Sequence, residues 1–292
     1  LPLSRVKESE SLFVDVRGLR YHVRRWGRLG APKVFLFHGW MDVSASFQFL
    51  VDAMRGDWDV YAPDWRGYGL TDWTKSDCYW FPDYVADLDF LVQRIEPDAP
   101  VRLVGHSLGG NVVCLYAGIK PERVAKLVNL EGFGLPPSRP EQAPKRYRLW
   151  LDELHEKPDL RPYADFRALA QRLQKNNPRL TDERADFLAR HWGKEVGGQV
   201  VLRGDPAHKI VNPLLYRYEE VRAIWQAVTA PTLWVEAAQS DTLARMKLDP
   251  AHAAERRAAF RDLRYDRVED AGHMLHHDQP EAVAALLEAF LA

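Results

Sequence analysis

The chain has 292 residues, of which 46% are apolar and 28% charged, the composition of a soluble globular protein. Its 40 basic and 41 acidic residues give a formal net charge of −1, so the whole chain carries no charge excess that would favour nucleic acid or an anionic membrane. Cys78 and Cys114 are its only cysteines and lack the spacing of a metal site. Because the sequence shows no leader-like or membrane-spanning apolar segment either, we expect a cytoplasmic protein.

Apolar periodicity predicts an N-terminal hairpin followed by alternating strands and helices. Strands are predicted at 12–16, 20–26, 34–37, 60–62, 101–104, 127–130, 232–235 and 263–268. Helices are predicted at 46–54, 84–95, 111–119 and 281–291. Such alternation is typical of an α/β fold with a mostly parallel sheet and helices on both faces.

Residues 133–226 interrupt this alternation. The segment shows no convincing strand pattern, is rich in proline and arginine, and has helical spacing of its apolar residues at 166–173. We interpret it as a helical cap, or lid, inserted into a core formed by residues 1–132 and 227–292. The expected position is over the carboxyl edge of the sheet, where ligand sites of α/β folds lie.

A serine flanked by glycines follows one of the predicted strands. The segment GHSLG at 105–109 has the pattern G-x-S-x-G and lies between strand 101–104 and helix 111–119. A sharp strand-to-helix turn exposes a serine hydroxyl, and glycines suit its crowded positions because they carry no Cβ. The free N–H groups at the start of the following helix also point to the site. Ser107 is therefore the predicted nucleophile, which needs an adjacent base.

Acyl transfer also requires N–H donors for the developing oxyanion. The candidates are the backbone N–H of Leu108, directly after the serine, and that of Trp40 in the loop after the third predicted strand. His38 is expected to orient this loop by hydrogen bonds rather than to carry a proton. We place His38 and the cap residues Trp150 and Trp192 among the expected substrate-binding residues; the alternative for the two cap rings is packing of the cap onto the core.

The base and its orienting acid are expected at the same sheet edge. His273 follows the last predicted strand and is the predicted base. Asp241 follows strand 232–235 and gives the chain order serine, acid, histidine, so it is the preferred acid. Glu131, which follows strand 127–130, is the alternative, because a triad is defined by geometry and spacing alone does not choose. His276 and His277 are expected to be exposed or to lie at the start of the final helix.

Four motifs in this order resemble the α/β-hydrolase superfamily. They are HGW (38–40), APDWRGYGLTD (62–72), GHSLGG (105–110) and DAGHMLHHDQPEAV (270–283). Within the superfamily, two stretches resemble the serine-hydrolase-like branch. These are HGWMDVSASF (38–47) and FLARHWGKEVGGQVVLRGD (187–205).

The resemblance implies an eight-stranded sheet, Ser107 as nucleophile, His273 as base and a helical cap after the sixth strand. Haloalkane dehalogenases and epoxide hydrolases of this superfamily carry aspartate at the nucleophile position, so the serine argues against both. The turn 237–241 departs from the family pattern, because it has no glycine before Asp241 and is one residue longer. This departure is a further reason to retain Glu131 as the alternative acid.

The expected function is that of a carboxylesterase-like serine hydrolase, which forms and then hydrolyses an acyl-enzyme without a metal or organic cofactor. The expected partner is a small-molecule acyl substrate, with neither nucleic acid nor a membrane, and a homodimer is compatible with the sequence. The alternatives are a carbon–carbon bond hydrolase acting on a diketone, an acyltransferase or perhydrolase with the same triad, and a ligand receptor without catalysis. Fold alone does not exclude a receptor.

Overall fold

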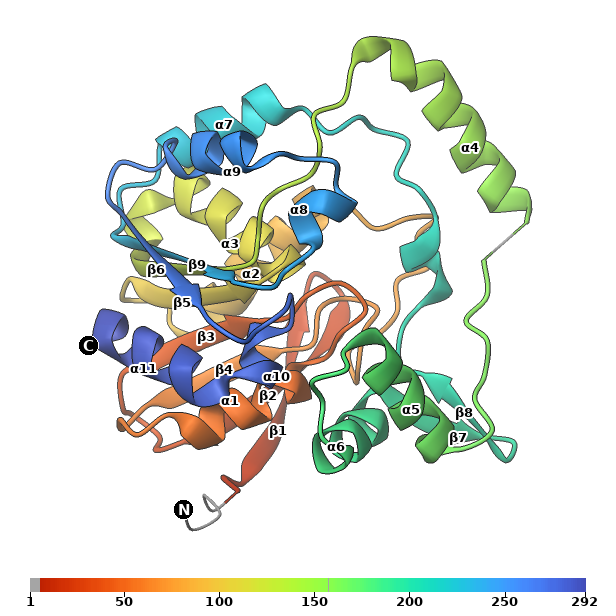
Figure 1. Ribbon diagram of the computed structural model, residues 1–292, viewed down its shortest axis with the longest axis horizontal. Helices are drawn as coiled ribbons and strands as arrows, with labels where there is room; N and C mark the ends of the chain where they lie inside the picture. The colour runs from red at the N-terminus through yellow and green to blue at the C-terminus, as the bar shows by residue number, and fades with distance from the viewer. Residues whose placement is uncertain (1–5, 157) are drawn as a thin grey trace.

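An eight-stranded sheet forms the centre of the protein (Figure 1). The computed structural model describes residues 6–156 and 158–292; residues 1–5 of the expected core and residue 157 of the expected cap lie outside the described residues. In the order of their neighbours, the strands are β1 (Ser9–Val16), β2 (Leu19–Gly27), β4 (Asp59–Pro63), β3 (Lys33–Phe37), β5 (Val101–His106), β6 (Val124–Leu130), β9 (Thr232–Ala237) and β10 (Leu263–Val268). β2 is antiparallel to β1 and β4, and the remaining pairs are parallel. The predicted α/β fold is confirmed.

Helices cover both faces of the sheet because the central strands are apolar on both sides. In β3, Phe35 and Phe37 belong to one buried cluster, and Val34 and Leu36 belong to the other, as the two-residue period of a strand requires. The first face is covered by α2 (Phe81–Ile95), α3 (Leu108–Ile119), α7 (Tyr218–Gln226) and α9 (Pro250–Arg257). The second is covered by the 3₁₀ helix η1 (Ser44–Phe47), α1 (Gln48–Ala53), α10 (Leu275–Asp278) and α11 (Pro280–Leu291). Among the described residues, we find no helix with the length and apolar character that crossing a bilayer requires.

The segment after β6 is mostly helical, but it also contains a hairpin. Its elements are η3 (Pro140–Gln142), α4 (Ala143–His155), α5 (Phe166–Asn176), α6 (Asp182–Trp192), β7 (Gly193–Val196), β8 (Gln199–Leu202) and η4 (Pro206–Lys209). The prediction of a segment without strands is therefore wrong at β7 and β8, which pair antiparallel. Gly197 and Gly198 both have positive φ, as a two-residue hairpin turn requires.

Two parts of this segment relate differently to the core. Helices α5 and α6 share a small apolar cluster with β8 through Leu169, Leu188 and Val200, and α4 has no buried residue and stands away from the sheet (Figure 1). Helix α7, although within the range expected for the cap, packs on α3 so closely that a Cβ at Gly118 would overlap the carbonyl of Ile224. α7 thus contributes to the helical layer on the sheet.

Candidate active site

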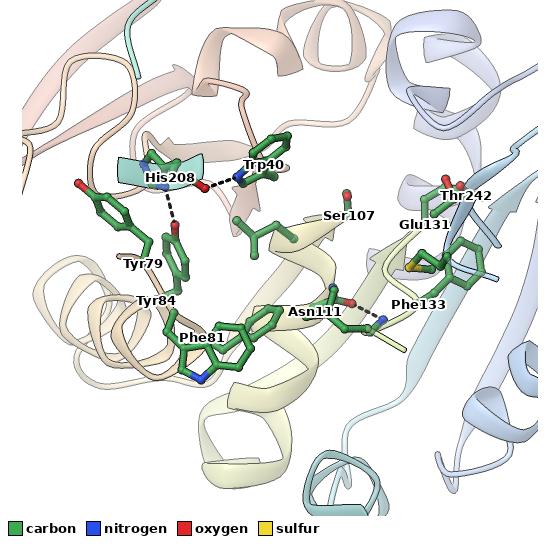
Figure 2. A pocket seen from close by; sticks show the side chains of 15 residues that line it. Trp40, Tyr79, Phe81, Tyr84, Ser107, Asn111, Glu131, Phe133, His208 and Thr242 are labelled. Carbon is green, nitrogen blue, oxygen red and sulfur yellow. Dashed lines mark hydrogen bonds between the residues drawn. The ribbon is translucent and has the colours of Figure 1, made fainter. Parts of the chain in front are cut away.

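Ser107 lies in a strained turn between β5 and α3. Its backbone has φ 54° and ψ −114°, a conformation that side chains with a Cβ rarely adopt. A Cβ at Gly105 would overlap the backbone of Gly109, and one at Gly109 would overlap the carbonyl oxygen of Phe37. The two glycines are therefore needed for the turn, and the serine side chain faces a cavity instead of the core (Figure 2).

His273 connects the serine to a buried carboxylate. Its Nε2 atom is 3.0 Å from Oγ of Ser107. Its Nδ1 atom is 3.1 Å from Oε2 of Glu131 and 2.9 Å from Oγ1 of Thr242. Because a carboxylate accepts only, the Nδ1–H group donates, which leaves Nε2 free to accept the serine proton. The three side chains form the geometry of a nucleophile, a base and an orienting acid.

Glu131 is held in place by the ends of two neighbouring strands. It follows β6 with φ 59°, and its backbone N–H donates to the carbonyl of Val235 in β9 at 3.0 Å. Oε1 accepts from the backbone N–H of Ala237 at 2.7 Å, and Oε2 accepts from the hydroxyl of Ser240. The residue is only 1% exposed, so these donors and the imidazole compensate the burial of its charge.

Asp241 lies outside this arrangement. Its side chain is 70% exposed and pairs with Arg245 one turn later at 3.0 Å. The next residue, Thr242, makes the contact with the imidazole. Since β6 and β9 are adjacent parallel strands, both acids follow strands at the same edge, and the longer turn after β9 directs Asp241 outward. Asp241 was the preferred acid and Glu131 the alternative. The structure corrects this preference, because Glu131 and not Asp241 contacts His273.

The cavity beside Ser107 is small and mostly aromatic. It has a volume of about 240 Å³. Its aromatic lining is Trp40, Tyr79, Trp80, Phe81, Tyr84 and Phe133, and its polar lining includes Ser107, Asn111, Glu131, His208 and Thr242. Of these, only His208 comes from the segment between α4 and α7. Phe133, Gly134 and Leu135 also fall within the range expected for the cap, and the core supplies the rest of the lining.

The sequence matches the model of the alpha/beta hydrolase fold family over residues 32–280. The chain belongs to the α/β-hydrolase family. It is similar to the serine hydrolase-like protein of Danio rerio, with 28% identity over 274 residues, which are 91% of this chain and 83% of that protein. It is also similar to lipase LipV of Mycobacterium tuberculosis, with 26% identity over 280 residues, which are 92% of this chain and 97% of that protein.

A solved structure supports the same fold for this α/β hydrolase. The thioesterase domain from the curacin biosynthetic pathway superposes with a TM-score of 0.86 at 24% sequence identity. The superposition covers 97% of this chain and 99% of that domain. The likeness therefore extends over both the sheet and the inserted segment.

The expected substrate-binding residues of this α/β hydrolase lie outside the lining of the cavity at Ser107. His38 is fully buried; its Nδ1–H donates to the carbonyl of Gly39 at 2.8 Å, and its Nε2 accepts from the N–H of Trp65 at 2.9 Å. Burial lowers the pKa of His38 to about 4, so the ring is neutral. This bonding suits the expected loop-orienting role, but His38 is absent from the cavity lining. The expectation of a substrate contact there is wrong.

The two cap tryptophans are corrected in the same way. Trp192 ends α6 and donates from its indole nitrogen to the hydroxyl of Ser46 at 3.1 Å, which joins the inserted segment to the core. Trp150 lies in α4 beside Tyr147, with the ring centroids 6.4 Å apart. Neither tryptophan lines the cavity at Ser107. For Trp192, the alternative of packing the cap onto the core describes its contacts.

Several residues that support the site were missed in the sequence. The side chain of Asn129 accepts from the N–H of Gly132 at 2.9 Å and donates to its carbonyl at 2.8 Å, which fixes the turn that carries Glu131. His106 is buried and donates from Nε2 to the carbonyl of His273 at 2.7 Å. Burial keeps the pKa of His106 well below its usual value, so it is a neutral support. The sequence signal for this role of His106 was its position inside the G-x-S-x-G pattern.

His276 and His277 are buried rather than exposed, with exposed fractions of 0% and 2%. Together with the buried Asp42, they form a group whose donor atoms lie within 4.8 Å of one another, the group of described residues best placed to hold a metal ion. Burial raises the pKa of Asp42 to about 7 and lowers that of His277 to about 3. Among the described residues, Oδ2 of Asp42, both ring nitrogens of His276 and Nε2 of His277 are buried without a hydrogen-bond partner.

Proposed function

We propose that this α/β hydrolase is a serine esterase that cleaves carboxylic esters of small apolar acids through an acyl-enzyme on Ser107. The observation that carries the proposal is the distance of 3.0 Å between Oγ of Ser107 and Nε2 of His273, at the wall of an aromatic cavity. A weak hydroxyl nucleophile requires such a base within hydrogen-bonding reach. The names of relatives, a lipase and a serine hydrolase-like protein, support the same class of reaction.

In the proposed reaction, His273 removes the proton of Ser107 as Oγ attacks the acyl carbon. Glu131 accepts the Nδ1–H bond and stabilises the imidazolium that forms, without taking the proton itself. His273 then protonates the leaving alcohol. Water follows the same route in reverse, which releases the acid and restores the serine.

The proposed oxyanion donors are the N–H groups of Leu108 and Trp40. Leu108 is the first residue of α3, so its N–H has no acceptor within the helix. The loop of Trp40 runs along the nucleophile, since a Cβ at Gly39 would lie 3.3 Å from Cβ of Ser107. Each donor at an oxyanion contributes on the order of 3 kcal/mol to lowering the barrier.

We also propose that the segment from 133 to the start of α7 acts as a cap over this site. Its 3₁₀ helix η4 places His208 in the cavity wall, where the ring is stacked between Tyr68 and Tyr79 with centroids 3.7 Å from each. The carbonyl of His208 accepts from the indole nitrogen of Trp40 at 3.4 Å (Figure 2). The cap therefore closes the side of the cavity that faces the oxyanion loop.

The test is hydrolysis of p-nitrophenyl esters together with labelling by a fluorophosphonate. The wild-type protein should hydrolyse acetate and butyrate esters and incorporate the label, and Ser107→Ala should lose both. Turnover of a diketone with little ester hydrolysis would indicate a carbon–carbon bond hydrolase, and ester formation with an added alcohol would indicate an acyltransferase. Perester or peracid formation with added peroxide would indicate a perhydrolase. A folded protein that neither labels nor turns over any of these would overturn the proposal in favour of a receptor.

A further inference from the structure

A second apolar groove lies directly behind one wall of the catalytic cavity. It has a volume of about 410 Å³, compared with about 240 Å³ for the cavity at Ser107. The groove runs between α2, α3 and α7, and its apolar lining includes Val85, Leu115, Ile119 and Ile224. None of these four residues lines the catalytic cavity. Two residues, Trp80 and Phe81, line both spaces.

The wall between the two spaces is formed by side chains at the start of α2. Phe81 is the first residue of this helix and is only 8% exposed. Its ring lies 5.2 Å from that of Trp80 and 6.2 Å from that of Tyr216, which lines the groove but not the cavity. Because the ring of Phe81 lines both the cavity at Ser107 and the groove, it forms part of the wall between them.

The charges around the groove are already paired. Nζ of Lys120 binds both oxygens of Asp89, at 2.8 and 3.0 Å. Nε of Arg217 lies 3.0 Å from Oε1 of Glu220. With these charges compensated, the groove offers apolar surface to a chain and no free ion for a charged end. The ligand chemistry that it fits is an uncharged, unbranched alkyl chain.

We propose that Phe81 sets the acyl length that this enzyme accepts, by closing the catalytic cavity against the groove, and that the groove binds the tail of a longer acyl chain once that wall is removed. The proposal rests on the esterase function proposed above. It makes Phe81 a specificity-determining residue, and it assigns the groove as a second, latent binding site for the distal part of an acyl group.

The test compares kcat/KM for p-nitrophenyl esters from acetate to dodecanoate. In Phe81→Ala, the ratio of decanoate to butyrate activity should rise at least tenfold over wild type, because each buried methylene strengthens binding by about fourfold. Phe81→Leu, which preserves more of the wall, should give a smaller rise and shows the effect if the alanine variant does not fold. The matched control is Phe90→Ala, a 46% exposed phenylalanine of the same helix that lines neither space and should leave the ratio unchanged.

A double variant tests the groove itself. Ile119 lines the groove and is 51% exposed, so the fold should tolerate a larger side chain there. Adding Ile119→Trp to Phe81→Ala should obstruct the groove and return the ratio to within about twofold of wild type. An unchanged ratio in active Phe81 variants, or a gain that survives Ile119→Trp, would overturn the inference while leaving the esterase function intact. Loss of the esterase function is distinct, because wild-type protein would then hydrolyse no ester of any length and take no fluorophosphonate label.

Discussion

Nδ1 of His273 and Oε2 of Glu131 are 3.1 Å apart although 142 positions separate the two residues in the chain. The pairing of β6 with β9 brings this carboxylate to the imidazole, while Asp241, which follows the neighbouring strand β9 of the sheet, points to solvent. The carboxylate that contacts His273 therefore follows the sixth strand of the chain.

The two acids should differ sharply in mutants. Glu131→Gln places an amide against Nδ1 and removes the charge that stabilises the imidazolium, so kcat for a p-nitrophenyl ester should fall by about a thousandfold to ten-thousandfold. Asp241→Asn alters only an exposed pair with Arg245 and should retain activity within about twofold. Comparable losses in both variants, or a larger loss in Asp241→Asn, would contradict the assignment.

The turn of Ser107 should not tolerate a methyl group at Gly109. A Cβ there overlaps the carbonyl oxygen of Phe37, so Gly109→Ala should lower the free energy of unfolding by about 3 kcal/mol, at the upper end for overpacking a core. Activity should fall with it, because the turn that aims the serine must shift. Gly30→Ala is the control: its φ is +86° with no atom within 4 Å, so it should cost about 1–2 kcal/mol and leave kcat unchanged. Urea denaturation and ester turnover measure the two effects.

The buried histidines should make the protein sensitive to acid. Burial lowers the pKa of His38 to about 4 and that of His208 and His277 to about 3, and it also holds those of His106 and His276 well below their usual value. Between about pH 6.5 and these values only the unfolded chain takes up the protons. The stability is thus fully present above pH 6.5 and is lost as the pH falls toward 3, by up to about 1.4 kcal/mol per pH unit for each histidine.

Asp42 acts in the opposite direction, because burial raises its pKa to about 7 and its share of the stability is lost as the pH rises from about 4 to 7. The five histidines outweigh this single carboxyl, so the urea midpoint should fall steeply from pH 7.5 through 6 to 5. His277→Gln should reduce the number of protons taken up on unfolding by about one, which makes the fall less steep. His155→Gln, at an exposed position in α4, should leave the slope as in wild type. A wild-type midpoint independent of pH over this range would refute the prediction.

Asp87 should be important for stability but not for the reaction. Its buried carboxylate binds Nε and Nη2 of Arg66 at 2.5 and 2.6 Å and also accepts from the hydroxyl of Tyr21. Asp87→Asn removes the buried counter-charge of Arg66 and leaves only its contact with the 41% exposed Asp83, so we expect a loss of about 3–5 kcal/mol in the free energy of unfolding. Asp83 on the same helix is 41% exposed, and Asp83→Asn should cost less than about 1 kcal/mol. Equal losses in thermal or urea unfolding would count against a special role for Asp87.

Local signals account for what the sequence predicted correctly. The strands of the sheet are short apolar runs, and the serine turn is marked by glycines whose Cβ positions are blocked by nearby backbone. The choice between Glu131 and Asp241 depends on which strand lies beside β6, which the residues near the two acids do not reveal, and on the length of the turn 237–241. The missing glycine and the extra residue in 237–241 were the available signal.

The remaining errors have a common physical origin in tertiary packing. His276 and His277 are polar, and their burial follows from the elements that cover them rather than from their own segment. The four-residue strands of the β7–β8 hairpin are too short for a clear apolar pattern, although two adjacent glycines marked its turn. The positions of Trp150 and Trp192 relative to the cavity depend on how the inserted segment packs on the core, and the spacing of residues within the segment does not determine this packing.

The hydrogen bond from the indole of Trp40 to the carbonyl of His208 has a consequence for protein engineering. This bond connects the loop with the proposed oxyanion donor to the inserted segment. Chimaeras that exchange the segment between relatives therefore break the bond unless the loop is exchanged with it. Chimaeras that take both partners of this bond from one protein should have the acyl selectivity of that protein. Chimaeras that break the bond should lose turnover of every acyl ester.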